Sequence, residues 1–147
     1  MKRTLFDALC VLLLLCAILC SCQETKKESF FDCAFSAELR WERDGLIICA
    51  LLEAKPPTSD GSARDLTLTF SEPPSLSGLT VQRQSGTLAL IRDGMRIDDC
   101  TGIDGLLYAA ELLFESGITV TLDSSGMPVA VESGGKRVTV IRYKKTE

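Results

Sequence analysis

The 147-residue sequence contains no histidine, and aromatic residues make up only 6% of it. Histidine is the most frequent general base near neutral pH and the most frequent metal ligand, so its absence excludes Ser/His/Asp and Cys/His catalytic arrangements. The chain also has no CxxC pair, P-loop or GxGxxG motif that would indicate a metal or nucleotide site. We therefore expect a protein that is not an enzyme and that carries no cofactor and no metal.

Basic charge is also scarce. Lys and Arg number 16 against 20 Asp and Glu, which gives a formal net charge of −4. The two signs are interleaved along the chain, so no concentrated positive surface is expected for a phosphate backbone, and nucleic acid is not an expected partner. With 46% hydrophobic and 24% charged residues, the composition is that of a folded globular protein. The length matches a single domain.

The first 22 residues have the three-part layout of a secretory signal. Lys2 and Arg3 come first, residues 8–20 form an uninterrupted apolar run, and the chain turns polar after Cys22. The run has about two-thirds of the ~20 residues that a membrane-spanning helix needs. A cleaved leader is therefore the favoured interpretation, and a retained N-terminal anchor is the alternative.

The leader ends in Leu19, Cys20, Ser21 and Cys22. This tetrapeptide resembles the lipobox of bacterial lipoproteins, in which Leu stands three places before an invariant Cys and small residues fill the places between. Taking Cys20 as the modified residue instead would put bulky Leu19 directly before it. The resemblance implies that Cys22 is lipidated and that residues 1–21 are removed as a signal peptide. It also implies a protein held by lipid at the extracytoplasmic side of the cell membrane.

After the lipidated cysteine, the chain divides into a tether and a domain. Residues 22–32 are expected to form the lipidated Cys and the tether, because residues 23–29 are polar and carry no aromatic side chain. Residues 33–147 are expected to form a single β-rich domain.

The first hairpin of this domain is expected around Asp44 and Gly45, the favoured pair for a two-residue type I′ turn. Residues 33–42 alternate between apolar and polar before the turn, and residues 47–54 continue as the return strand. The expected opposite pairs are Arg43 with Leu46, Trp41 with Ile48, Leu39 with Ala50, and Ala37 with Leu52. The other face of the return strand carries Ile47, Cys49 and Leu51, which predicts cover on both faces.

Further strands follow, for a total of about seven to nine. They are expected at residues 66–70, 79–83, 87–92, 95–98, 118–122, 127–132 and 136–143. Turns are expected at residues 84–86, at Asp93-Gly94 and at Gly134-Gly135. The segment 55–65 is rich in Pro and Gly and is expected to break the pairing.

Residues 101–117 have a helical period. Apolar side chains recur at spacings of three and four, while Asp104, Tyr108, Glu111 and Glu115 form one narrow polar stripe. Thr101 with Asp104 resembles a capping box, and Gly117 is the expected stop. Because most of the circumference is apolar, the helix is expected to lie in a concavity.

The lipobox, the hairpins and the apolar helix together resemble the LolA/LolB-type lipoprotein carriers. The segments 66–83 (LTLTFSEPPSLSGLTVQR) and 123–143 (DSSGMPVAVESGGKRVTVIRY) look like the middle and closing strands of their unclosed barrels. The resemblance implies an α+β, mainly antiparallel β fold: a curved sheet or half-barrel with one apolar helix in the concave face. It also implies binding of lipid or another apolar ligand. The alternative is a non-catalytic interaction or structural module on the outer face of the cytoplasmic membrane.

Three cysteines follow the leader: Cys33, Cys49 and Cys100. The hairpin register puts Cys33 and Cys49 on opposite faces, which disfavours a bridge between them. Free buried thiols are the favoured interpretation, and a bridge to Cys100 is the alternative.

Two further features have a structural and a functional interpretation. The acidic cluster Asp98, Asp99 and Asp104 lacks the pattern of a calcium loop, and acidic residues before a helix are expected from its dipole alone. Trp41 is interpreted as a core anchor near the hairpin, with a ligand-stacking residue as the alternative. No residue is assigned a catalytic or metal-binding role.

Overall fold

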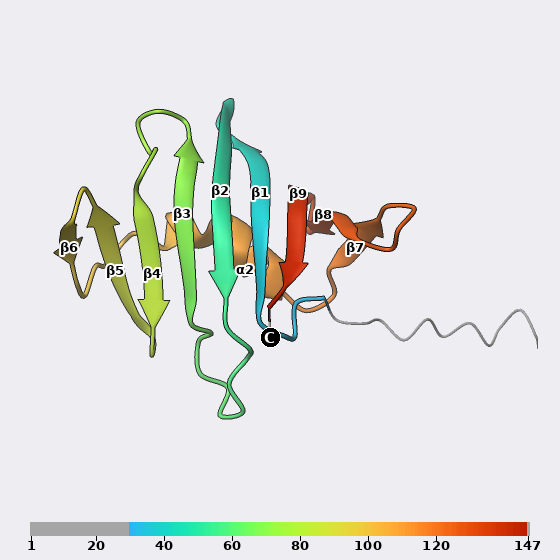
Figure 1. Ribbon diagram of the computed structural model, residues 1–147, viewed down its shortest axis with the longest axis horizontal. Coiled ribbons are helices and arrows are strands. Elements are labelled where there is room, and N and C mark those ends of the chain that lie inside the picture. Colours follow the sequence, from blue (N-terminus) through green and yellow to red (C-terminus); the bar gives the residue numbers. More distant parts are fainter. Residues whose placement is uncertain (1–29, 147) are drawn as a thin grey trace, which may run out of the picture.

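The computed structural model describes residues 30–146 of the chain. In this part, nine strands form one antiparallel sheet that is not closed (Figure 1). The strands are β1 (Phe35–Arg43), β2 (Leu46–Ala54), β3 (Leu66–Glu72), β4 (Thr80–Gln84), β5 (Thr87–Arg92), β6 (Met95–Ile97), β7 (Thr119–Leu122), β8 (Pro128–Ser133) and β9 (Lys136–Lys145). Their order across the sheet is β6-β5-β4-β3-β2-β1-β9-β8-β7. The last strand therefore returns to pair with the first, and β6 and β7 form the two edges.

The β1–β2 hairpin is as expected from the sequence. Asp44 and Gly45 have φ of 53° and 75°, the left-handed backbone that a type I′ turn requires at both central positions. All four expected opposite pairs are present in the register. The turn chemistry and the apolar alternation thus select the same register, and that register puts one apolar set on one face.

Three more two-residue turns repeat this geometry. Positive φ occurs at both central positions between β4 and β5, between β5 and β6, and between β8 and β9. The turn residues are Ser85-Gly86, Asp93-Gly94 and Gly134-Gly135. The backbone twist of these turns matches the right-handed twist of the strands, so the two strands of each hairpin stay paired up to the turn.

The helical segment is shorter than expected. Asp104–Leu107 form a 3-10 helix, η1, and Tyr108–Phe114 form the α-helix α2. The backbone is already extended at Glu115, so Gly117 lies beyond the helix and is not its stop. The expected length of 101–117 is wrong at both ends.

The expected capping box is also wrong. No side chain caps η1 or α2. Gly102, between Thr101 and Asp104, has φ of 77°, and this left-handed residue turns the chain away from a helical path before the segment starts.

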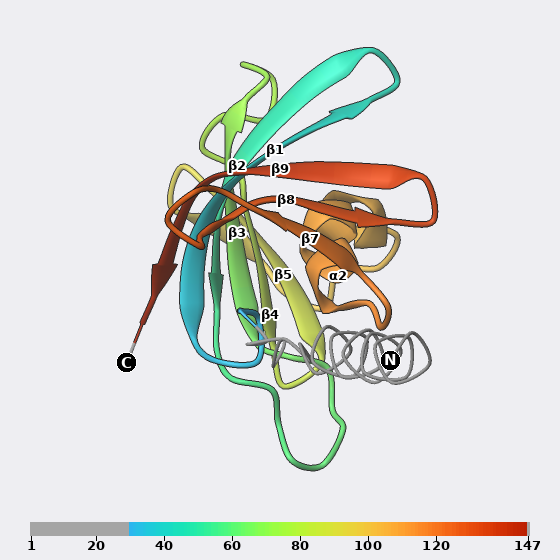
Figure 2. The ribbon, with the colours of Figure 1, turned by 90° about the vertical axis from the view of Figure 1, so that its right-hand side faces the viewer.

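The core lies between one face of the sheet and the helical segment (Figure 2). The largest fully buried side chains come from both layers: Phe35, Leu39, Leu52, Leu68, Phe70, Val81, Leu112, Leu113, Val131 and Val138. Trp41 is buried with them and meets Phe70 edge-on, with 6.2 Å between ring centroids, which confirms its interpretation as a core anchor. Both halves of the sheet share this single core.

The outer face of β2 is covered only at Cys49, which is 9% exposed, and this corrects the expectation of cover along the whole face. Ile47 is 43% exposed and Leu51 is 44% exposed. On this face β1 presents the charged residues Glu38, Arg40 and Glu42 opposite β2. Within residues 30–146, no second layer packs on these charged neighbours, and scattered exposed apolar side chains are common on protein surfaces.

Candidate functional site

The space between α2 and the sheet is filled with side chains. On the helix, Leu112 and Leu113 are each 1% exposed, and Ala109 and Ala110 are completely buried. The sheet residues that face them are equally buried and belong to the same core cluster. No buried side-chain nitrogen or oxygen in the described residues lacks a hydrogen-bond partner. Side chains therefore occupy the space between α2 and the sheet, and the hollows that could serve as sites lie on the surface.

A buried arginine organises the end of the domain at which the chain enters the fold. Arg64 is only 8% exposed. Its guanidinium donates hydrogen bonds to the main-chain carbonyls of Phe31, Cys33 and Lys55. It has no acidic partner within ion-pair distance among the described residues. Burial lowers the pKa of the Arg64 guanidinium, and the carbonyls supply the compensation that a carboxylate would otherwise provide.

Aromatic rings complete the surroundings of this arginine. The guanidinium lies 4.8 Å from the ring centroid of Phe114 and 5.3 Å from that of Phe35. Phe31 and Tyr143 stack or meet edge-on with Phe35. Aromatic faces favour a planar cation. Arg64 thus ties the end of α2, the loop 55–65 and the first described residues into one unit.

The same unit holds the start of the domain by a second contact. The hydroxyl of Tyr143 on β9 donates to the carbonyl of Phe30, and the Cys33 thiol donates to the same carbonyl at 3.4 Å. Burial, and then the contact with Cys33, raise the pKa of Tyr143. Phe31 is buried in the core, although residues 22–32 were expected to form the tether. The fold therefore already holds the chain at residue 30.

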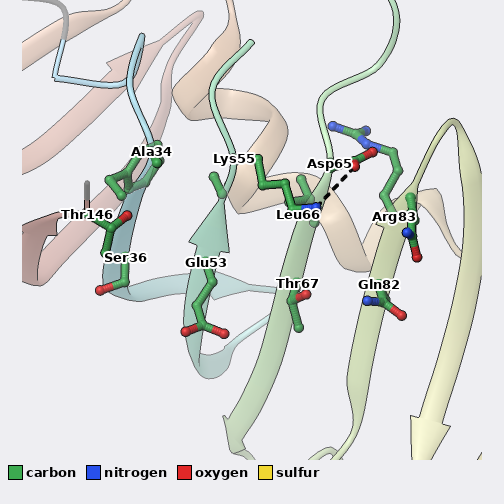
Figure 3. A pocket seen from close by; sticks show the side chains of 13 residues that line it. Ala34, Ser36, Glu53, Lys55, Asp65, Leu66, Thr67, Gln82, Arg83 and Thr146 are labelled. Carbon is green, nitrogen blue, oxygen red and sulfur yellow. Dashed lines mark ion pairs between the residues drawn. The ribbon is translucent and has the colours of Figure 1, made fainter. Parts of the chain in front are cut away.

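A hollow of about 330 Å³ lies across β1 to β4 beside the loop 55–65 (Figure 3). Ser36, Glu53, Thr67 and Gln82 are successive cross-strand neighbours in its lining. Lys55 and Asp65 form an ion pair of 3.7 Å at its edge, drawn as a dashed line in Figure 3. These hydroxyl, amide and charged groups suit contact with a polar partner and do not suit an acyl chain.

A second hollow of about 450 Å³ lies beside Arg64. Arg83 crosses it, donating to the carbonyl of Arg64 at 2.7 Å and pairing with the Glu111 carboxylate. Since both arginines are satisfied by groups of the protein itself, this hollow offers no free cation to a ligand.

Cys33, Cys49 and Cys100 are free thiols in the structure, with no bridge among them. Of the three, only Cys49 is buried, while Cys33 and Cys100 are partly exposed, so the expectation of buried free thiols holds in full for Cys49 alone. Burial and a hydrogen bond to Glu72 raise the pKa of Cys49, so this thiol is less reactive than an ordinary cysteine.

The acidic cluster is not assembled into a ligand set. Asp98 pairs with Arg96 at 2.7 Å, and Asp99 adopts a left-handed φ of 54° in the connection to η1. Within residues 30–146, no group of three or more Cys, Asp or Glu side chains is placed to hold a metal ion.

The lipidation residue, Cys22, and the signal peptide lie outside the described residues. No helix within residues 30–146 is long and apolar enough to span a bilayer. The organising role of Arg64 was not predicted, because it lies in a Pro- and Gly-rich break and no sequence pattern marks its main-chain partners. No protein-family model matches the chain, and no curated protein matches it.

Proposed function

We propose that the protein is a bacterial lipoprotein anchored through Cys22 at the extracytoplasmic side of the cell membrane, and that its domain is a non-catalytic interaction module. The lipobox Leu19–Cys22 supports the anchor. The filled space between α2 and the sheet supports the module, because a domain without an interior cavity recognises its partners with its surface.

The position of the helix argues against the alternative function, which is binding of lipid or another apolar ligand as in the LolA/LolB-type carriers. We place α2 in the concave face of the curved sheet, where its four buried residues occupy the room that an acyl chain would need. An apolar ligand would have to displace Leu112 and Leu113. Such displacement exposes the core to water and is costly.

The tie between Arg64 and the start of the domain supports a limited distance between this end of the domain and the membrane. Residue 30 is held by the fold, so the chain between Cys22 and residue 30 can span at most about 25–30 Å. The loop 55–65 lies at the same end as residue 30 (Figure 2), and the β1–β2 turn lies at the other. In this arrangement, the β1–β2 turn points away from the bilayer.

The anchor is tested by replacing each of two neighbouring cysteines. Cells are fed an alkyne fatty acid, and the protein is captured and coupled to a dye. We expect Cys22→Ser to abolish labelling and to leave the precursor uncleaved. Cys20→Ser is the matched control and should be labelled as the wild type is. Labelling that persists in Cys22→Ser would contradict the lipobox interpretation.

The module is tested with cis-parinaric acid, whose fluorescence rises in an apolar site. The lipidated protein purified in detergent is titrated beside Leu112→Trp, which adds volume at the helix–sheet contact. An interaction module gives no saturable signal in either protein. If the wild type binds cis-parinaric acid saturably and Leu112→Trp does not, the interaction-module proposal is contradicted and the protein is an apolar-ligand carrier instead.

A further inference from the structure

The sheet divides where β1 and β9 stop pairing. Their ladder ends at Arg40 opposite Thr139, yet β1 continues to Arg43 and β9 begins at Lys136. Beyond this point the β1–β2 and β8–β9 hairpins diverge toward their turns (Figure 2). Residues 41–43 and 136–138 therefore each have a neighbouring strand on one side only.

The register identifies which main-chain groups face the gap. A two-residue turn closes with a hydrogen-bonded pair, and bonded and non-bonded pairs alternate from there. Glu42 opposite Ile47 and Arg137 opposite Glu132 are thus non-bonded pairs in their hairpins. Their N–H and C=O groups point away from the hairpin partner. Glu42 and Arg137 consequently offer free donors and acceptors from the two sides of the gap.

A cleft of about 510 Å³ occupies this gap. Its lining includes three cations, Arg40, Lys136 and Arg137, against one carboxylate, Glu42. Arg40 forms no ion pair within the described residues, while Lys136 and Arg137 pair only with exposed Glu115 and Glu132. Exposed pairs of this kind contribute little, so these cations remain available to another anion. The lining of the cleft thus holds two more cationic than anionic side chains, on a chain whose formal charge is −4.

The inner side of the cleft carries an aromatic ring flanked by cations. Tyr108 begins α2, and the Lys136 ammonium and Arg43 guanidinium lie 5.5 Å and 5.8 Å from its ring centroid. Arg43 also donates to the carbonyl of Gly105 at 3.1 Å, which holds the β1–β2 hairpin against η1. Both hairpins that border the cleft therefore contact the helical segment. These contacts hold the two hairpins apart in the structure without a bound partner.

We propose that this cleft binds an extended, acidic segment of a partner protein, which adds as a strand between β1 and β9. The segment runs antiparallel to one of these strands and parallel to the other, because β1 and β9 are themselves antiparallel. Its main chain pairs with Glu42 and Arg137, and its carboxylates lie on the outer face of the sheet, where they meet Arg40 and Arg137. About three of its residues lie between the free stretches, since strands share a rise of about 3.3 Å per residue.

This inference rests on the proposed function as an interaction module and names its partner class. The binding experiment uses the lipidated protein in detergent and a fluorescein-labelled peptide of alternating Glu and Val, read by anisotropy. We expect saturable binding that Arg40→Glu and Arg137→Glu each weaken about tenfold or more. Arg142→Glu, a matched charge reversal on β9 outside the cleft, should stay within about twofold of the wild type.

Strand addition is separated from charge attraction by a second peptide. Pro replaces alternate Val residues, so the charge is kept and N–H donors are lost. We expect at least about tenfold weaker binding of this peptide. We also expect slowed amide hydrogen exchange in residues 41–43 and 136–138 with the Glu/Val peptide. Equal binding of the two peptides, or an equal effect of Arg142→Glu, overturns the proposal.

Two other results would overturn it as well. The first is no binding of the Glu/Val peptide. The second is its displacement by soluble dihexanoylphosphatidylglycerol with the same dependence on Arg40 and Arg137, which would assign the cleft to a lipid headgroup. Neither result affects the outcome of the cis-parinaric acid titration. The two experiments therefore distinguish a wrong assignment of the cleft from a wrong assignment of the domain as an interaction module.

Discussion

Replacing Arg64 with methionine removes the guanidinium and keeps most of the side-chain volume. The carbonyls of Phe31, Cys33 and Lys55 then lose their donors at a buried position. A hydrogen bond to a charged group contributes about 1.5–3 kcal/mol, and the relief of burying the charge offsets part of the loss, so we expect a net destabilisation of about 3 kcal/mol. For a domain of this size, that lowers the melting temperature by about 10 °C.

The assay is thermal unfolding by circular dichroism, with Arg142→Met as the matched control. The Arg142 side chain is 81% exposed, so its replacement should change stability by less than about 0.5 kcal/mol. Arg64→Lys keeps the positive charge but loses the planar guanidinium with its several N–H donors. Its melting temperature should therefore lie between those of the wild type and Arg64→Met. Limited proteolysis should show faster cleavage within residues 55–65 in Arg64→Met. A melting temperature within about 2 °C of the wild type would refute the role given to Arg64.

Three further outcomes are expected. Leu113→Asp should lower stability by several kcal/mol in urea unfolding because it buries an unpaired charge, whereas Leu122→Asp, at a side chain 46% exposed, should have little effect. Gly45→Ala, at a φ of 75°, should cost about 1–2 kcal/mol in the same measurement. Glu72→Gln should lower the raised pKa of Cys49, so that alkylation of this thiol, followed by mass spectrometry, begins at a lower pH. An unchanged alkylation profile would contradict the contact between Cys49 and Glu72.

The strands and hairpins were predictable because their signals are local. Asp44-Gly45, Asp93-Gly94 and Gly134-Gly135 each favour a left-handed two-residue turn, and the structure has all three. Alternation then assigned the buried face of β1 correctly, including Trp41. Each of these signals acts over fewer than about ten residues, a distance over which backbone sterics and side-chain direction are decided together.

The helical segment was predicted in kind but not in extent. Periodicity located the apolar residues that α2 buries, but Gly102 and the extended backbone at Glu115 shorten the helix at each end. The expected cover over Ile47 and Leu51 failed for a related reason. An apolar pattern shows which side chains favour burial, and only the packing of the other elements decides which of them obtain it.

The candidate sites could not be predicted, since they depend on contacts between distant segments. Arg64 lies 33 residues from Phe31, and the two meet because the paired strands β1 and β2 bring their flanking segments together. The positive cleft depends on the point at which β1 and β9 separate, and nothing in the sequence near Arg40 or Arg137 marks that point.

Neighbouring residues in the sequence were enough for the membrane-anchor prediction at Cys22, the antiparallel β class, the positions of the hairpin turns and the register of the β1–β2 hairpin. The tertiary structure alone decided that the helix–sheet space is filled, that a buried arginine holds the start of the domain, and that two hairpins diverge around a cationic cleft. These features come from the way the open sheet bends and from the pairing of its last strand with its first. That bend is set by the packing of the whole core, which no short stretch of the sequence specifies.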